Sequence, residues 1–252
     1  MEFIKEGKFK YIESIGGKDV LLLLHGLFGG LSNFESIIER FGNKYNVVMP
    51  LLPILELPTR EVTLENLVNF VEDFIEFKSF NKVNVLGNSL GGHIAQLLAF
   101  QRPEIIHSLV LTGSSGLFEN SMGSTFPKRG NYEFIKTKTE STFYDPSVAS
   151  KELVDEVFDI VNDRMKAIKI VATAKSAIRH NVENKLDKLK APTLLIWGKQ
   201  DTITPPFVGE KFHALLSNSE LHFIDKCGHA AMMEKPNEFS TILENFLVKV
   251  CT

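Results

Sequence analysis

The sequence has only two cysteines, Cys227 and Cys251, which are too few for a framework of disulfide bonds. It also has no apolar run as long as a membrane span. Its N-terminus alternates charged and apolar residues and does not resemble the hydrophobic segment of a signal peptide. Reduced thiols without an export signal are typical of a cytoplasmic protein, which is the location we expect.

The sequence also has no large excess of basic over acidic residues, or of acidic over basic ones. The chain has 28 Lys and Arg against 31 Asp and Glu, for a net charge of -3, and the basic residues are scattered. This distribution excludes the basic footprint of a nucleic-acid-binding protein and favours a small-molecule partner. Because repeats, low-complexity tracts and long linkers are also missing, we expect one domain over residues 1–252.

Short apolar runs rich in β-branched residues recur along the chain, and amphipathic stretches of helical spacing separate most of them. The stretch 64–75, with apolar residues on one face and acidic residues on the others, is typical. Such alternation predicts an α/β fold with a mostly parallel sheet buried on both faces. The predicted strands are 20–24, 46–49, 83–86, 108–111, 193–197 and 221–224.

The alternation of strands and helices breaks between about residues 116 and 190. Glycine, serine, proline and aromatic residues come first, and a helical region containing Leu153, Val157 and Ile168 follows. We interpret this segment as an inserted helical cap that supplies part of an apolar pocket. Several of its aromatic and sulfur-containing residues are candidates for that pocket, although most are expected only to hold the cap together: Phe118, Met122, Phe126, Phe143 and Tyr144.

The strongest local motif is G-x-S-x-G, formed by Gly87, Ser89 and Gly91. It lies directly between the apolar strand VNVL and the apolar helix HIAQLLAFQ, which is the context that a nucleophile elbow requires. A side chain at either glycine would collide where strand and helix pack closely. The motif predicts Ser89 as a nucleophile; the alternative is a tight strand-to-helix turn without chemistry.

A serine nucleophile needs a general base and an acid that orients the base. His229 follows a late strand in the motif KCGH, and Asp201 follows the strand TLLIW. Asp225 is a rival acid, but it is so near His229 in the sequence that we expect it to brace the loop. The chain order Ser89, Asp201, His229 is the one found in α/β-hydrolase triads.

A metal site and a dinucleotide-binding turn are two alternatives to this interpretation. A metal could be held by four candidate ligands near the C-terminus, yet no H-E-x-x-H or C-x-x-C spacing occurs. The glycines of HGLFGG do not match the dinucleotide-binding pattern G-x-G-x-x-G. We therefore expect no metal and no cofactor. The candidate ligands are His222, Asp225, Cys227 and His229.

The motifs GNSLGG, HGLFGG, GKQDTITP and KCGHAAMMEKP together resemble the α/β-hydrolase superfamily over nearly the whole chain. The resemblance implies an eight-stranded, mostly parallel sheet flanked by helices, with an inserted helical cap. It also implies an oxyanion hole formed by the backbone N–H groups of Leu27 and Leu90. Within the superfamily, GNSLGG, FYDPSVASKELV and KCGH look most like meta-cleavage-product carbon–carbon hydrolases and related small esterases.

We expect a serine hydrolase that cleaves a small carboxylic ester through an acyl-enzyme. The carbon–carbon hydrolases that the chain resembles usually have a cap arginine and a tryptophan directly after the histidine. Here Ala230 follows His229, and Val157 falls where the arginine would be, although Arg164 could replace it if the cap were shifted. A carbon–carbon hydrolase and a ligand-sensing module remain alternatives, and the loop PLLPILELP departs from the family pattern.

Overall fold

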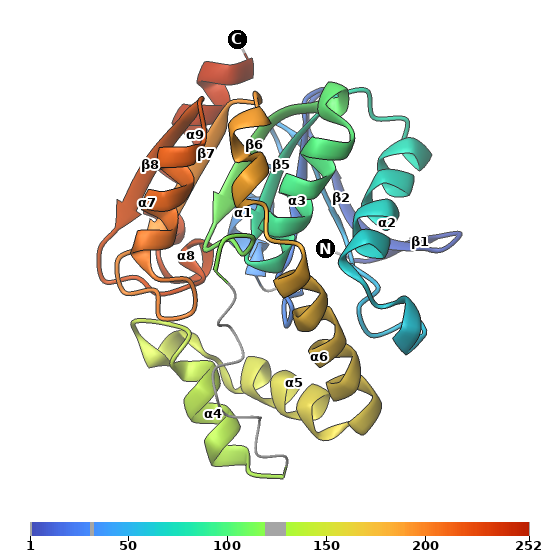
Figure 1. The fold of residues 1–252 in the computed structure, drawn as a ribbon, viewed down its shortest axis with the longest axis vertical. Helices are drawn as coiled ribbons and strands as arrows, with labels where there is room; N and C mark the ends of the chain where they lie inside the picture. The colour runs from blue at the N-terminus through green and yellow to red at the C-terminus, as the bar shows by residue number, and fades with distance from the viewer. Residues whose placement is uncertain (1, 31–32, 119–129, 252) are drawn as a thin grey trace.

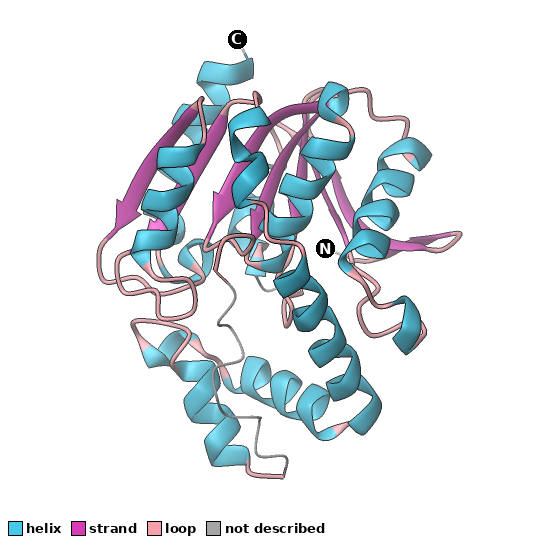
Figure 2. Cartoon of the chain, viewed as in Figure 1, coloured by secondary structure: helices cyan, strands magenta, loops and turns pink. Residues whose placement is uncertain are grey.

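The computed structural model describes residues 2–30, 33–118 and 130–251 (Figures 1 and 2). Its centre is one eight-stranded sheet with the strand order β1-β2-β4-β3-β5-β6-β7-β8. The strands are β1 (Ile4–Glu6), β2 (Phe9–Ile15), β3 (Val20–Leu24), β4 (Asn46–Pro50), β5 (Val83–Asn88), β6 (Ile106–Thr112), β7 (Thr193–Gly198) and β8 (Ser219–Ile224).

All strand pairs from β4 to β8 are parallel, whereas β1 pairs with β2 and β2 with β4 in antiparallel register. The prediction of an eight-stranded, mostly parallel sheet is therefore confirmed. All six predicted strands are present, with ends that differ by up to two residues. The sequence did not indicate β1 and β2, because β1 is exposed along its whole length and β2 carries lysine and glutamate among its apolar residues.

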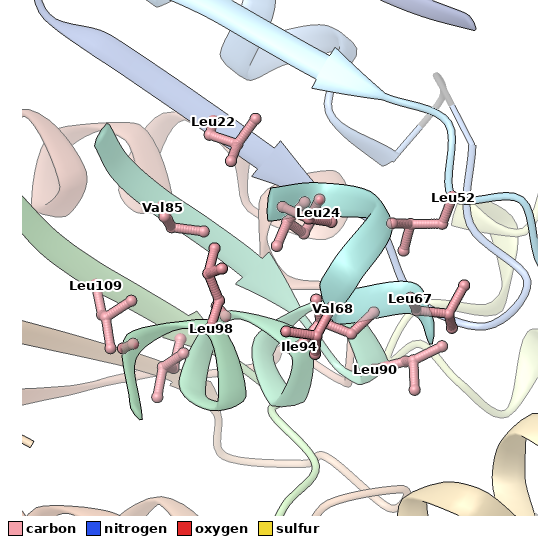
Figure 3. Packing of buried hydrophobic residues seen from close by; sticks show 14 of the residues in the cluster. Leu22, Leu24, Leu52, Leu67, Val68, Val85, Leu90, Ile94, Leu98 and Leu109 are labelled. Carbon is pink, nitrogen blue, oxygen red and sulfur yellow. The ribbon is translucent and has the colours of Figure 1, made fainter. Parts of the chain in front are cut away.

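Helices cover both faces of the sheet (Figure 1). The helices α1 (Glu35–Phe41), α8 (Ala231–Glu234) and α9 (Pro236–Cys251) pack on one face, and α2 (Leu64–Phe77), α3 (Leu90–Gln101) and α7 (Pro206–Leu215) pack on the other. Because side chains alternate along a strand, Leu21 and Leu23 of β3 enter the first core, and Leu22 and Leu24 enter the second (Figure 3).

The segment between β6 and β7 contains three further helices among its described residues: α4 (Tyr132–Glu140), α5 (Lys151–Asn162) and α6 (Arg164–Arg179). They lie beyond the carboxyl ends of the parallel strands (Figure 1). Helix α4, with the sequence YEFIKTKTE, was not predicted because it has few apolar residues. Four 3₁₀-helices complete the described elements: η2 (Thr59–Glu61), η3 (Pro103–Ile105), η4 (Pro146–Val148) and η5 (Glu183–Lys188).

No helix in the described ranges has both the length and the apolar character needed to cross a membrane. The loops that follow β3, β5, β7 and β8 all leave the same edge of the sheet, because these strands run parallel. This edge faces α4, α5 and α6, and it is where the candidate site lies (Figure 1).

Candidate functional site

Ser89 occupies the turn between β5 and α3. Its backbone angles, φ 54° and ψ -117°, place a non-glycine residue in a sparsely populated region. The turn is held because the Ser89 N–H donates to the carbonyl oxygen of Thr112 at 3.1 Å. A Cβ atom at Gly91 would lie 1.9 Å from the carbonyl oxygen of Leu24, and one at Gly87 would lie 2.5 Å from the Gly91 carbonyl carbon. Close packing of β3, β5 and α3 therefore requires both glycines.

His229 and Asp201 are brought together by the loops after β8 and β7. The Nδ1 atom of His229 lies 2.9 Å from Oδ2 of Asp201, and both side chains are buried. The backbone N–H of His229 donates to the carbonyl oxygen of Thr142 at 2.8 Å. A proton on Nδ1, donated to the carboxylate, leaves the Nε2 atom with a free lone pair.

The Asp201 carboxylate has further donors besides the histidine. Its Oδ1 atom accepts the backbone N–H groups of Ile203 and Thr204 at 2.8 and 2.9 Å, and Oδ2 accepts the Thr204 hydroxyl at 2.9 Å. Asp225 is placed differently, because it is exposed and lies near Gln200 and Lys199. The structure thus brings Asp201, and not Asp225, to His229.

The loop after β3 contains a buried histidine. Nε2 of His25 accepts the backbone N–H of Leu52 at 3.0 Å, so the ring proton is on Nδ1 and is donated to the carbonyl oxygen of Gly26 at 2.8 Å. Burial lowers the pKa of His25, which keeps the ring neutral as this pattern requires. His25 thus shapes the loop by joining it to the segment after β4.

Leu27 lies in the loop after β3, and Leu90 directly follows Ser89. Both residues and Ser89 line one cavity, which His229 also lines. Within the described ranges, neither backbone N–H donates to a protein acceptor. Leu90 is also the first residue of α3, where a helix presents free N–H groups and the positive end of its dipole. The two donors are therefore available to an anionic oxygen.

The cavity has a volume of about 490 Å³ and lies between the strand ends and the helices α4 to α6. The walls that α4, α5 and α6 form are mostly apolar. They include Phe134 and Ile135 of α4, Leu153, Val157 and Val161 of α5, and Ala174 and Ala177 of α6. Near His229 the lining is more polar, with Ser141, Thr142 and Thr202.

The predicted pocket residues have different positions. Phe143 lines the cavity, but Phe118 packs against Phe207 with ring centres 5.4 Å apart, and Tyr144 is largely exposed. Of the candidates within the described residues, Phe143 therefore lines the cavity, and Phe118 and Tyr144 do not. Met122 and Phe126 lie outside the described residues.

The four candidate metal ligands near the C-terminus do not gather around one point. Within the residues that the structure describes, no group of three or more His, Cys, Asp and Glu side chains could hold a metal ion. His229 is directed to Asp201, whereas the Cys227 thiol lies near the carbonyl oxygen of Gly228. The arrangement suits proton transfer and not metal coordination.

Comparison with known proteins places this chain in a family. The sequence matches the alpha/beta hydrolase family over residues 21–242. The chain belongs to the alpha/beta hydrolase family. The solved structure of MGS-MChE2, an alpha/beta hydrolase enzyme from the metagenome of sediments from the lagoon of Mar Chica, Morocco, shares 41% identity with this family member, over 100% of both chains and with a TM-score of 0.83.

Curated relatives in the alpha/beta hydrolase family differ in what they act on. A 2-hydroxy-6-oxononadienedioate/2-hydroxy-6-oxononatrienedioate hydrolase from Paraburkholderia phymatum is 28% identical over 96% of this chain and 91% of the relative. The monoacylglycerol lipase ABHD6 from Bos taurus is 25% identical over 93% of this chain and 77% of the relative. These similarities establish the family and do not determine the substrate.

Three residues of the candidate site were missed in the sequence. Thr204 could have been found, because a residue three positions after an aspartate often donates its backbone N–H to that side chain, as at a helix N-cap. Lys138, on the cavity side of α4, could not, because α4 itself was not predicted. Glu234 accepts hydrogen bonds from Gly228 and from residues about 90 positions earlier, and no local pattern reveals such partners.

Proposed function

We propose that the chain is a serine hydrolase that cleaves small carboxylic esters through an acyl-enzyme. Ser89 is the nucleophile, His229 the general base and Asp201 the acid that orients the histidine. One observation carries this proposal: the 2.9 Å contact between His229 Nδ1 and Asp201 Oδ2 lies beside the cavity that Ser89 lines. Family membership agrees with it.

In the first step, Nε2 of His229 takes the proton of the Ser89 hydroxyl as the oxygen attacks the ester carbonyl carbon. The C=O π bond becomes an oxyanion, which the backbone N–H groups of Leu27 and Leu90 stabilise by roughly 3 kcal/mol each. Asp201 favours the imidazolium that forms. When the tetrahedral intermediate collapses, His229 gives its proton to the departing alcohol.

The second half of the reaction uses the same groups. His229 removes a proton from water, which attacks the acyl carbon, and the oxyanion again lies between Leu27 and Leu90. Collapse of this intermediate returns the proton to Ser89 and releases the carboxylic acid. The mostly apolar walls from α4, α5 and α6 suit the hydrocarbon part of the ester.

Fluorophosphonate labelling tests the nucleophile. We expect labelling of the native protein and none of Ser89→Ala, because the probe reacts with an activated serine hydroxyl. Ser115 also lines the cavity, so Ser115→Ala is the matched control and should label normally. Labelling that persists in Ser89→Ala would refute the assignment. In a separate experiment, a panel of p-nitrophenyl esters of increasing chain length would define the substrate range of the native protein.

A second candidate function is carbon–carbon bond hydrolysis of a ring-fission product. The relative from Paraburkholderia phymatum favours it, and so does Lys138, a basic residue that lines the cavity. The Lys138 ammonium lies 5.9 Å from the centre of the Phe134 ring, which also lines the cavity. A cation on α4 could pair with a dienoate carboxylate, whereas Val157 cannot.

Turnover of p-nitrophenyl butyrate against a 2-hydroxy-6-oxo-dienoate distinguishes the two functions. For the ester hydrolase, we expect a preference for the butyrate and the same kcat/KM in Lys138→Met. The carbon–carbon hydrolase would prefer the dienoate and would lose roughly tenfold or more in Lys138→Met through a raised KM. Lys136→Met, on the same helix and beside Glu140, is the control.

The proposed compartment is the cytoplasm. Cys227 and Cys251 are both free thiols, which a reducing environment maintains. Burial raises the pKa of Cys227 to about 12, so this thiol stays protonated and takes no part in the proposed chemistry.

A further inference from the structure

Glu234 is a buried carboxylate at the end of α8. Its Oε2 atom accepts the backbone N–H of Gly228 at 2.6 Å and that of Tyr144 at 3.2 Å, and its Oε1 atom accepts the backbone N–H of Asp145 at 2.6 Å. The side chain makes no ion pair with a lysine or arginine within the described ranges. Backbone N–H groups therefore provide its neutralising contacts.

The donors belong to two segments that are far apart in the sequence. Gly228 directly precedes His229, whereas Tyr144 and Asp145 lie between α4 and α5. Segment 141–145 also contacts both loops of the proposed triad directly. The carbonyl oxygen of Thr142 accepts the N–H of His229 at 2.8 Å, and that of Ser141 accepts the Thr202 hydroxyl at 3.2 Å.

We propose that Glu234 is a positioning residue that docks segment 141–145 against the His229 loop, so that His229 is held in its working position only while this segment is docked. The inference rests on the proposed function. Its physical basis is that one carboxylate serves both segments. Displacing the segment would remove two donors from a buried charge and the acceptor of the His229 N–H.

A purely stabilising role for Glu234 makes a different prediction. The carboxylate would then contribute to the free energy of unfolding, and each folded molecule of a variant would turn over at the native rate. The two roles are separated by kcat per active site, counted by fluorophosphonate labelling.

The first test is Glu234→Gln, which keeps the size of the side chain but removes the charge and one acceptor. We expect kcat for p-nitrophenyl butyrate to fall roughly 10- to 100-fold per labelled site, with KM almost unchanged, because a misplaced base slows proton transfer. Glu238→Gln, at an exposed position in the first turn of α9, is the matched control and should keep the native kcat.

The second test leaves Glu234 in place, in case its replacement prevents folding. Asp145→Pro removes the N–H that Oε1 accepts, and the φ of -95° at this residue is near the range of about -65 ± 15° that proline adopts. Asp145→Ala keeps that N–H and is the control. We expect kcat to fall in the proline variant and not in the alanine variant. The effect of combining Asp145→Pro with Glu234→Gln should be less than the product of the two.

Hydrogen exchange tests the docking without any substrate. In Asp145→Pro, we expect the amides of residues 141–144 and those of 228 and 229 to lose protection together. Loss confined to the amides of residues 141–144, or native kcat per site in both Glu234→Gln and Asp145→Pro, would overturn the proposal. Failure of the ester-hydrolase function would appear separately, as no turnover or labelling by the native protein.

Discussion

At the residue scale, Asp201 depends on being a carboxylate and not only on its shape. Both of its oxygens accept hydrogen bonds, from the backbone N–H groups of Ile203 and Thr204 and from the Thr204 hydroxyl and His229. An amide at this position would direct an N–H at one of these donors. If that amide N–H donates to Nδ1 of His229, the neutral imidazole must carry its own proton on Nε2. The Nε2 atom then has no free lone pair and cannot act as a base.

Asp201→Asn should therefore lower kcat for p-nitrophenyl butyrate by roughly 10³- to 10⁴-fold with KM little changed, as in other triads. Asp225→Asn should keep the native kcat, because Asp225 is exposed and contacts Gln200. Steady-state kinetics of the two purified variants measure this difference. A greater loss in Asp225→Asn would reverse the assignment.

At the element scale, the junction of β5 and α3 has no space for additional atoms. A Cβ atom at Gly91 would lie 1.9 Å from the Leu24 carbonyl oxygen, so β3 and α3 would have to separate. We expect Gly91→Ala to lower the free energy of unfolding by about 3 kcal/mol or more.

Urea unfolding followed by circular dichroism measures the effect of Gly91→Ala. Gly30→Ala is the control, because the nearest atom to a Cβ there is the Glu156 carboxylate oxygen at 3.9 Å. Equal stability of the two variants would contradict the close approach of β3 and α3.

Helix α5 supplies the apolar wall through one face, with Leu153, Val157 and Val161 spaced by four residues. Enlarging Val157 to tryptophan should fill part of the cavity that Ser89 also lines. We expect kcat/KM for p-nitrophenyl octanoate to fall roughly 10- to 100-fold while the acetate ester is unaffected. Glu152→Trp, on the exposed side of α5, controls for a general effect on the helix. Unchanged chain-length preference in Val157→Trp would show that the acyl chain lies elsewhere.

At the scale of the whole molecule, buried histidines couple stability to pH. Nε2 of His93, in α3, donates to the carbonyl oxygen of His180 at 2.9 Å. This hydrogen bond joins α3 to the end of α6. Burial lowers the pKa of His93 to about 4 and also lowers that of His25. In the unfolded chain, both pKa values return to about 6.5.

Between these values the unfolded state binds more protons than the folded state, so stability falls as the pH drops below about 6.5. For His93 the loss approaches 1.4 kcal/mol per pH unit, as an order of magnitude, and ends near its folded pKa of about 4. Urea unfolding at several pH values should show that the free energy of unfolding of His93→Gln changes less steeply with pH than that of the native protein. His213→Gln, at an exposed position, should keep the native slope, and identical slopes in all three proteins would contradict the buried neutral state of His93.

Local patterns in the sequence determined the alternating strands and helices and the turn at Ser89. Each depends on interactions within a few residues: apolar spacing defines the buried faces of β3 and α2, and two glycines allow the turn between β5 and α3. These features could be predicted because they do not depend on which distant segments meet. The exposed strand β1 and the polar helix α4 were missed because burial is what creates an apolar pattern, and β2 was missed because charged residues interrupt its apolar ones.

The sequence predicted that Asp201 pairs with His229, but only the tertiary structure brings the two residues into contact. Asp201 and His229 are separated by 28 positions, and only the neighbouring ends of β7 and β8 bring their side chains to 2.9 Å. The walls of the cavity were decided in the same way, because the packing of α4, α5 and α6 directs Val157 inward and leaves Tyr144 exposed. Hydrogen bonds and contacts act over a few ångströms in space, so residues distant in sequence interact only once the sheet and its covering helices have formed.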